Sequence, residues 1–384
     1  MLNVSIIGVG NCGNQVAALA YERLHIPVIA INSSEKDLET VPSSIPRVLL
    51  KKIDGTSEGA GKDRKLAKEY MRDSAVAFFE KSEYTDIIDT SDIVFIVSST
   101  GGGTGSGIVP VFSNILDQTY KGNKKIITVG VLPSESESLD AHINTFQYLT
   151  ELKNVLVGQT YMLYDNEKAS SMPSYKAMEF INNEIVNDIN VLRCFFNYTT
   201  KYDSIDSQDM MRILECAGRV MVTRLDNFKD KDCDTVTIEQ LLIDKMKKNA
   251  HVEGQRDKRV NETGLIVNLS NYLLEDFDTQ LKSVKEFIGE PNHGYTHLYI
   301  NAERSDPNNV FLIMSGLTFI HDKCDKIKDR IEEIEERQKS YEQQSALDEF
   351  NIDDYDSKLN TKANKAGMER ASVDIQSTFS KFGL

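Results

Sequence analysis

The sequence predicts an α/β protein with a parallel-sheet N-terminal domain, a central spine helix, a second, smaller mixed α/β domain, and a long C-terminal helix with a tail. Three observations predict this order. Short apolar runs alternate with helical stretches early in the chain, which is typical of parallel strands buried on both faces. A long helical stretch without proline or glycine follows, and a strongly charged stretch lies near the end. The expected boundaries are 1–170, 171–197, 198–320, 321–350 and 351–384.

The N-terminal domain is expected to contain at least four buried strands. VSIIGV (4–9) leads into a glycine turn and a helix through about Leu24, and IPVIAIN follows. DIVFIVSS near 92–99 and KIITVGVL near 125–132 are also apolar runs of strand length. Runs of four to eight apolar residues bounded by turn signals indicate such strands.

The spine helix is expected from about Tyr175 to Phe195. Apolar residues recur along it at helical spacing, namely Met178, Ile181, Ile185, Ile189 and Leu192. The second domain is expected to hold helices at 207–217 and 273–288 and strands at 219–225, 264–269, 295–302 and 310–316. The stretch 322–345 reads as a solvated helix packed along one stripe, and 351–384 reads as a flexible tail that orders on a partner.

Composition excludes several classes of function. The formal net charge of -15 argues against direct, non-specific nucleic-acid binding, which needs a basic surface. No apolar run reaches the roughly 18 residues that span a bilayer, so we expect a cytoplasmic protein that does not associate with membranes. The cysteines lack CxxC spacing and are expected to be reduced thiols rather than zinc ligands or disulfides; they are Cys12, Cys194, Cys216, Cys233 and Cys324.

The first glycine turn fits two kinds of nucleotide. Gly8, Gly10 and Gly13 match GxGxxG between a strand and a helix, where phosphates approach the backbone and the helix N-terminus. A dinucleotide site also needs an acid at the end of the second strand, but that strand ends at Asn32, with Glu35 just beyond. A dinucleotide, a mononucleotide and a purely structural turn all remain possible on this loop alone.

The second glycine loop points to phosphate binding. Residues 101–107 (GGGTGSG) follow an apolar strand and precede a helix expected to begin near Ile108. Five glycines in seven positions have a high entropic cost, which indicates a loop conformation that only glycine can form. Exposed amides with the Thr104 and Ser106 hydroxyls at a helix N-terminus predict a phosphate cradle. It is not a P-loop, because no GK[ST] follows.

These two loops resemble the tubulin and FtsZ family. GGGTGSG is the signature loop of that family, and residues 10–15 (GNCGNQ) resemble the GQCGNQ of eukaryotic tubulins. The segments 32–38, 58–62 and 133–137 resemble the second, third and fifth nucleotide loops. The resemblance assigns nucleotide contacts to Gly10, Asn11, Cys12, Gly13, Gln15, Asn32, Gly59, Ala60, Gly61, Gly101, Gly102, Gly103, Thr104, Gly105, Ser106, Pro133, Glu137, Asn166, Phe180 and Asn183.

Some of these residues have specific roles by resemblance. The third loop senses the γ-phosphate, Glu137 binds the ribose, and Asn166 lies near the guanine. On the spine helix, Phe180 would stack on guanine and Asn183 would bind its edge. Their spacing is three, whereas the family spacing is four, so Asn182 or Tyr175 is an alternative. The fifth loop departs from the family pattern because Ala141 stands where an arginine is expected.

The resemblance also implies catalysis between neighbouring subunits. Asp206 and Asp209 match two acids three apart at the start of a helix; in the family they orient and polarise the attacking water on the neighbour's GTP, while Mg²⁺ and the glycine cradle stabilise the phosphoryl charge. Asp203 is a weaker candidate, and Ser204 stands where FtsZ has asparagine. A purely structural alternative is that this stretch only caps the helix.

The implied function is that of a GTPase that forms head-to-tail filaments with itself. The long charged C-terminal helix and the tail resemble the plasmid and bacteriophage tubulins of the TubZ and PhuZ type, in which filaments segregate or position DNA, so a DNA-binding adaptor would dock on the tail. The alternatives are an FtsZ-like cell-division protein or other prokaryotic tubulin, a member that binds GTP without turnover, and an NAD-dependent oxidoreductase using the first glycine turn.

Overall fold

The computed structural model describes residues 2–120, 122–154, 158–194, 207–252, 260–270, 272–273, 286, 295–300 and 308–343, with 295–300 given as backbone. Its contacts divide the chain into two compact units, Met1–Ile331 and Glu332–Leu384. The fold and the sites below belong to the first unit.

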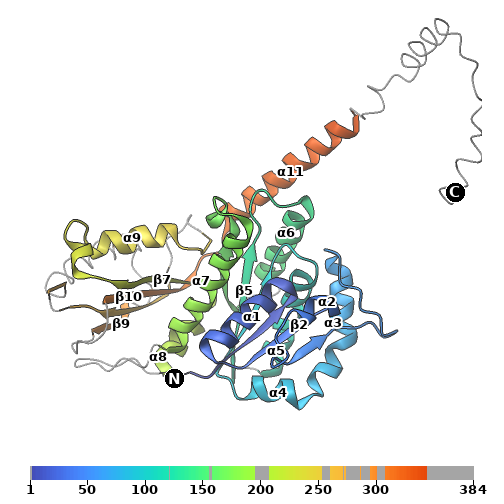
Figure 1. Ribbon diagram of the computed structural model, residues 1–384, viewed down its shortest axis with the longest axis horizontal. Helices are drawn as coiled ribbons and strands as arrows, with labels where there is room; N and C mark the ends of the chain where they lie inside the picture. The colour runs from blue at the N-terminus through green and yellow to red at the C-terminus, as the bar shows by residue number, and fades with distance from the viewer. Residues whose placement is uncertain are drawn as a thin grey trace, which may run out of the picture. The chain divides into compact units, whose positions relative to one another are not determined.

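A single sheet runs through the first unit (Figure 1). Its ten strands in the described residues lie in the order β3-β2-β1-β4-β5-β6-β7-β10-β8-β9. Their bounds are β1 Val4–Val9, β2 Val28–Asn32, β3 Arg47–Leu49, β4 Ile93–Ser99, β5 Lys125–Leu132, β6 Thr160–Asp165, β7 Gly218–Phe228, β8 Glu262–Asn268, β9 Tyr295–Ile300 and β10 Asn308–Leu317. The α/β class and the parallel N-terminal sheet are confirmed.

The strands β1 to β6 are parallel, whereas β10 pairs antiparallel with both β7 and β8. The two parts of the sheet meet at a short parallel pairing, in which Thr160 and Tyr161 of β6 lie opposite Gly218 and Arg219 of β7. The second α/β region therefore continues the first sheet.

The helices cover both faces of this sheet. Their bounds are α1 Gly10–Leu24, α2 Glu35–Glu39, α3 Arg64–Phe79, α4 Ser82–Asp89, α5 Thr104–Tyr120, α6 Leu139–Asn154, α7 Ser174–Cys194, α8 Ser207–Glu215, α9 Ile238–Lys248 and α11 His321–Gln343, with 3-10 turns η1 Asn166–Ala169 and η3 Asp230–Cys233. One core cluster joins the sheet to α1, α7 and α8, and α7 lies beside α1 (Figure 1). A second cluster joins the sheet to α3, α5, α6 and the start of α11. A third packs α9 against β7, β8 and β10.

The spine helix is confirmed as α7, with one exception on its apolar stripe. Ile181, Ile185 and Ile189 are buried in the core, but Met178 is half exposed. The helix after the second glycine loop begins at Thr104 rather than near Ile108, because the end of the glycine motif already forms its first turn. The expected helix at 273–288 and the tail at 351–384 lie largely or wholly outside the described residues.

The order of the parallel strands fixes where a ligand would bind. Strand β1 lies between β2 and β4, so the chain reverses its direction of winding at the β1–β4 boundary. In open α/β sheets, ligands bind beyond the carboxyl ends of the strands at such a switch point. Both glycine motifs leave the sheet there, after Val9 and after Ser99. In the part of the chain that the structure describes, no helix is long and apolar enough to cross a membrane.

Candidate nucleotide site

The first glycine turn joins β1, α1 and β4 at very short range. A Cβ atom on Gly8 would lie 2.3 Å from the Gly13 carbonyl oxygen, and one on Gly13 would lie 2.0 Å from that of Val97. Gly10 starts α1 with a left-handed φ of +73°, which side chains disfavour. The valine before the helix has no polar side chain to cap it, so the first amides of α1 remain available for an anion.

Four of the five glycines of the second loop, all but Gly102, serve close packing, and none of the five needs an unusual backbone angle. None of Gly101, Gly102, Gly103, Gly105 and Gly107, all within the described residues, has a left-handed φ. A Cβ on Gly103 would lie 2.7 Å from the Lys62 nitrogen, and one on Gly105 would lie 2.7 Å from the Ser98 Cβ. The expectation that only glycine can adopt this loop therefore needs correction, since the limiting factor is space.

The predicted second and third nucleotide loops, 32–38 and 58–62, contact the second glycine loop and each other. The hydroxyls of Ser33 and Thr104 lie 2.8 Å apart, and the amide of Gly59 donates to the Ser33 carbonyl at 2.9 Å. Ala60 is buried, and Gly59 and Gly61 both have left-handed φ angles. All three predicted loops therefore meet at the carboxyl ends of the strands.

The predicted Asn32 is buried and supports its own loop. Its side-chain oxygen accepts the amides of Ser33 and Ser34 at 2.8 and 3.3 Å, and its side-chain nitrogen donates to Asp37 at 3.3 Å. Asn32 thus stabilises the conformation of the 32–38 loop through hydrogen bonds inside that loop.

Two residues that were not predicted from the sequence hold the second glycine loop in place. The Asn144 side-chain nitrogen donates to the carbonyls of Lys62, Gly101 and Gly102 at 2.9, 3.3 and 3.2 Å. The buried Arg64 donates to the Ser106 carbonyl at 2.9 and 3.3 Å and pairs with Glu151 at 2.8 Å. Nothing in the local sequence marks these two residues, because their partners lie far away in the chain.

A pocket of about 380 Å³ opens beside the first glycine turn. Several predicted residues line it, namely Asn11, Cys12, Gln15, Glu137 and Asn166. Glu137 accepts hydrogen bonds from the Ser134 amide at 3.0 Å and from the Asn166 side chain at 3.3 Å. Burial, with a further contribution from the charge of Glu137, raises the pKa of the Cys12 thiol to about 12, so this thiol is neutral at physiological pH. Pro133 precedes the lining residue Ser134.

The face of α7 that lines the pocket differs from the predicted one. Ala177, Met178, Ile181 and Asn182 line it, and Asn182 donates to the Gln15 side chain at 3.5 Å. At 100° per residue, Phe180 and Asn183 belong to another face; Phe180 packs against the core. Tyr175 is 64% exposed and is likewise outside the described lining. The spacing of four that the family shows is met by Met178 and Asn182.

Of the candidate catalytic acids, Asp209 is described, and it lies at the opposite end of the sheet from the glycine loops. Asp206, with Asp203 and Ser204, falls outside the described residues, and Asp209 lies in the first turn of α8. The carbonyl of Leu214 in the same helix accepts a hydrogen bond at 2.9 Å from Thr160, the first residue of β6. The pocket lies beyond the last residues of the parallel strands. A strand of six residues such as β6 is about 20 Å long, so the pocket is at least that far from Thr160. Asp209 therefore cannot reach the pocket of its own chain.

No group of three or more His, Cys, Asp or Glu residues within the described ranges is arranged to hold a metal ion. The expectation that nucleotide phosphates hold any Mg²⁺ ion stays a prediction. The five cysteines are free thiols.

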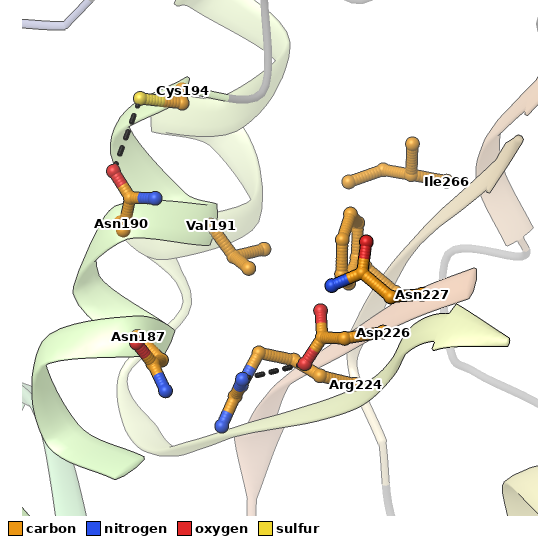
Figure 2. Close-up of a pocket in the computed structure, with 9 residues that line it drawn as sticks. Asn187, Asn190, Val191, Cys194, Arg224, Asp226, Asn227 and Ile266 are labelled. Carbon is orange, nitrogen blue, oxygen red and sulfur yellow. Dashed lines mark hydrogen bonds and ion pairs between the residues drawn. The ribbon is translucent and has the colours of Figure 1, made fainter. Parts of the chain in front are cut away.

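A second pocket, of about 290 Å³, lies between α7 and the strands β7, β8 and β10 (Figure 2). The charged side chains that line this pocket already form ion pairs within the protein. Arg224 pairs with Glu184, Asp188 and Asp226 at 2.6, 2.6 and 2.7 Å, and these carboxylates raise its pKa against the opposing effect of burial. The buried Asp188 also bonds Tyr164 and His251, at 2.8 and 2.9 Å. This network fastens α7 to the second part of the sheet.

Comparison with known proteins agrees with this geometry. Residues 3–173 match the model of the tubulin/FtsZ family, GTPase domain. The tubulin-like protein CetZ of Pyrococcus horikoshii is 27% identical over 217 residues, which cover 56% of this chain and 58% of that protein. The chain thus matches little more than half the length of this relative.

Two solved structures share the fold. The phage c-st TubZ of Clostridium botulinum, truncated at its C-terminal tail, aligns with a TM-score of 0.69 at 20% identity, covering 87% of this chain and 97% of that one. The GTPγS-form protofilament of Bacillus thuringiensis serovar israelensis TubZ aligns at 0.75 with 15% identity, covering 90% and 94%. At these identities, the likeness establishes the fold alone. Residues 3–173 are therefore similar to the GTPase domain of the tubulin/FtsZ family, and the chain shares the fold of these solved tubulin-like structures.

Proposed function

We propose that the protein binds GTP at the switch point of the sheet and hydrolyses it between head-to-tail copies of itself. One observation carries the proposal: the phosphate loops and the acid Asp209 lie at opposite ends of the same parallel sheet. Stacking two copies in the same orientation would bring the acid end of one onto the loop end of the next. Because such a heterologous contact does not close on itself, it produces a filament.

The phosphates would lie against the second glycine loop and the N-termini of α1 and α5. The amides at these helix ends, together with the Thr104 hydroxyl, offer donors to phosphate oxygens. Arg64 and Asn144 would hold the loop from behind, through the carbonyls of Ser106 and Gly102. Mg²⁺, when bound to the phosphates, would neutralise the charge that develops during phosphoryl transfer.

The base and ribose would occupy the pocket next to α7. Asn182 can offer its amide to the guanine edge, and the Met178 thioether can lie against the ring face, which is a favourable sulfur–aromatic contact. Glu137 would accept from the ribose hydroxyls. Phe180 and Asn183, the residues suggested by resemblance, would then support the helix rather than touch the base.

The water would be activated by the acids of the neighbouring copy. Asp209 lies in the first turn of α8. We assign it, with Asp206, to orienting and polarising the attacking water. Hydrolysis would then require assembly.

The likeness to a phage TubZ supports a role in segregating or positioning plasmid or phage DNA, with an adaptor docking on 351–384. The CetZ likeness supports another prokaryotic tubulin function equally well. A truncation at Asn351 separates these roles: we expect unchanged GTP binding, but altered assembly or loss of adaptor capture. Unchanged pelleting and capture would contradict the tail assignment.

The central test combines GTP titration, phosphate release and electron microscopy across a range of protein concentrations. We expect saturable GTP binding, filaments with GTP, and a specific activity that rises with concentration once filaments form. Saturable NADH binding without GTP binding would replace the proposal with an oxidoreductase. Filaments without phosphate release would favour a member that binds GTP without turnover.

A further inference from the structure

We propose that the start of α11 sets the position of the two loops that line the nucleotide pocket, with Lys323 and Arg330 as positioning residues. The proposal rests on the proposed function, because it assumes that the pocket beside Glu137 holds the nucleotide. It adds that nucleotide affinity depends on how α11 is seated, so that the C-terminal helix and the pocket are thermodynamically linked.

The 133–137 loop is held by α11 through Arg330. The Arg330 Nε donates to the carbonyl of Glu135 at 3.2 Å. The Glu135 amide donates to the Glu167 carboxylate at 2.8 Å. One peptide unit on either side of Glu135 is therefore fixed, two residues before the pocket-lining Glu137.

The η1 turn is held by α11 through Lys323. The Lys323 Nζ pairs with Asp165 Oδ2 at 2.8 Å, and both side chains are largely buried. The other oxygen of Asp165 accepts the Glu167 amide at 3.1 Å and so caps η1. That turn carries Asn166 and Ala169 into the pocket.

The two loops are also joined on the pocket side. Glu137 accepts from Asn166 at 3.3 Å, while Glu135 and Glu167 are joined on the side facing α11. A shift of either loop would therefore change the distance between Glu137 and Asn166, two groups that face the nucleotide.

The helix is a firm support for these contacts. Ile327 is 5% exposed in the core, with Cys324 and Ile331 packed beside it. Between this support and the loops lies a cavity of about 340 Å³, lined by Glu135, Asp165 and Lys323 among others. Polar contacts therefore bridge α11 to the loops, and their removal should loosen the loops without dismantling the core.

Nucleotide binding and the seating of α11 must affect one another equally, because a coupling free energy is reciprocal. A net hydrogen bond contributes about 0.5–1.5 kcal/mol. We therefore expect Arg330→Ala and Lys323→Gln each to weaken the affinity for a fluorescent GTP analogue about two- to tenfold. GTP should in turn slow amide exchange in residues 321–331.

The experiment uses the full chain, with Arg337→Ala as the matched control. Arg337 lies on the same helix and pairs with Glu333 at 2.8 Å. We expect amide exchange in 133–138 and 166–169 to accelerate in Arg330→Ala and Lys323→Gln, but not in Arg337→Ala. Arg330→Lys, which keeps a donor, should restore most of the affinity.

The outcomes separate the two proposals. Absence of GTP binding by the wild type would overturn the proposed function. Wild-type binding with equal affinity in all variants would overturn the positioning role alone. If Arg330→Ala weakens binding only as far as thermal melts show global unfolding, and exchange in the loops rises no more than elsewhere, the contact is merely structural and the inference is wrong.

Discussion

Gly103 lies against the main chain of Lys62 so closely that a Cβ atom on Gly103 would come within 2.7 Å of the Lys62 nitrogen. The neighbouring Gly102 has its nearest such contact at 3.9 Å, with the Ser99 hydroxyl. Neither glycine has a left-handed φ. Two adjacent glycines of one motif thus differ in the space around them and not in this backbone restriction.

We predict that Gly103→Ala destabilises the nucleotide-free protein by about 1–3 kcal/mol, the usual cost of overpacking. Gly102→Ala should be neutral or slightly stabilising, because alanine reduces the entropy of the unfolded chain. Denaturant unfolding without nucleotide measures both. Equal losses in the two variants would show that the motif depends on backbone angles after all.

Asp209→Ala should leave GTP binding intact, lower the rate of hydrolysis at least 100-fold, and produce persistent filaments. The rate estimate follows from the usual contribution of a positioned acid or base. Asp206→Ala is expected to behave in the same way. Titration, phosphate release and pelleting provide the measurements, and Glu215→Ala, at the other end of α8, is the control. Normal hydrolysis by Asp209→Ala in sedimenting polymer would end the catalytic assignment.

The strands predicted best are those whose burial is uniform. The apolar runs at 4–9, 92–99 and 125–132 became β1, β4 and β5 with at most one residue of error, because both faces of each strand are covered. Strand β6 (TYMLYD) was missed although all six of its residues are buried. Its polar atoms find distant partners, as when the Tyr164 hydroxyl meets Asp188, and a local pattern cannot show this.

The site was predictable in its loops but not in its long-range supports. Both glycine motifs carry a local signal, because the strand, the glycines and the helix start follow one another directly in the sequence. Asn144 and Arg64 have no such signal, because their partners are brought to them only by the fold. On α7 the pocket is lined by Met178 and Asn182 rather than by the predicted Phe180 and Asn183, and which pair contacts a base stays a prediction.

Asn182→Ala should weaken GTP binding about tenfold and reduce the preference for GTP over ATP, because the pocket loses a hydrogen-bonding group for the base. Asn183→Ala is the matched control, one residue along the same helix and outside the described lining of the pocket. Competitive titration with GTP and ATP measures both effects. A larger loss in Asn183→Ala than in Asn182→Ala would restore the assignment made from resemblance.

Acid should destabilise the protein partly through His142, which lies in α6 and is 3% exposed. Burial lowers the pKa of His142, and the charges of Arg330 and Lys323 act in the same direction, while the Glu135 backbone and the Glu137 charge oppose them. The unfolded chain takes up this proton near pH 6.5, whereas the folded chain takes it up only at lower pH. The unfolded state therefore binds more protons, and the free energy of unfolding falls as the pH drops through about 6.5.

We therefore expect His142→Gln to lose less of its melting temperature than the wild type between pH 7 and pH 5, by a few degrees for a stability difference of about 1 kcal/mol. Groups shared by both proteins cancel in this comparison. His25→Asn is the control: His25 is exposed, and asparagine tolerates its left-handed φ of 52°. Thermal melts of the nucleotide-free proteins at several pH values provide the measurement. Parallel pH profiles for wild type and His142→Gln would show that His142 takes up its proton equally in the folded and unfolded states.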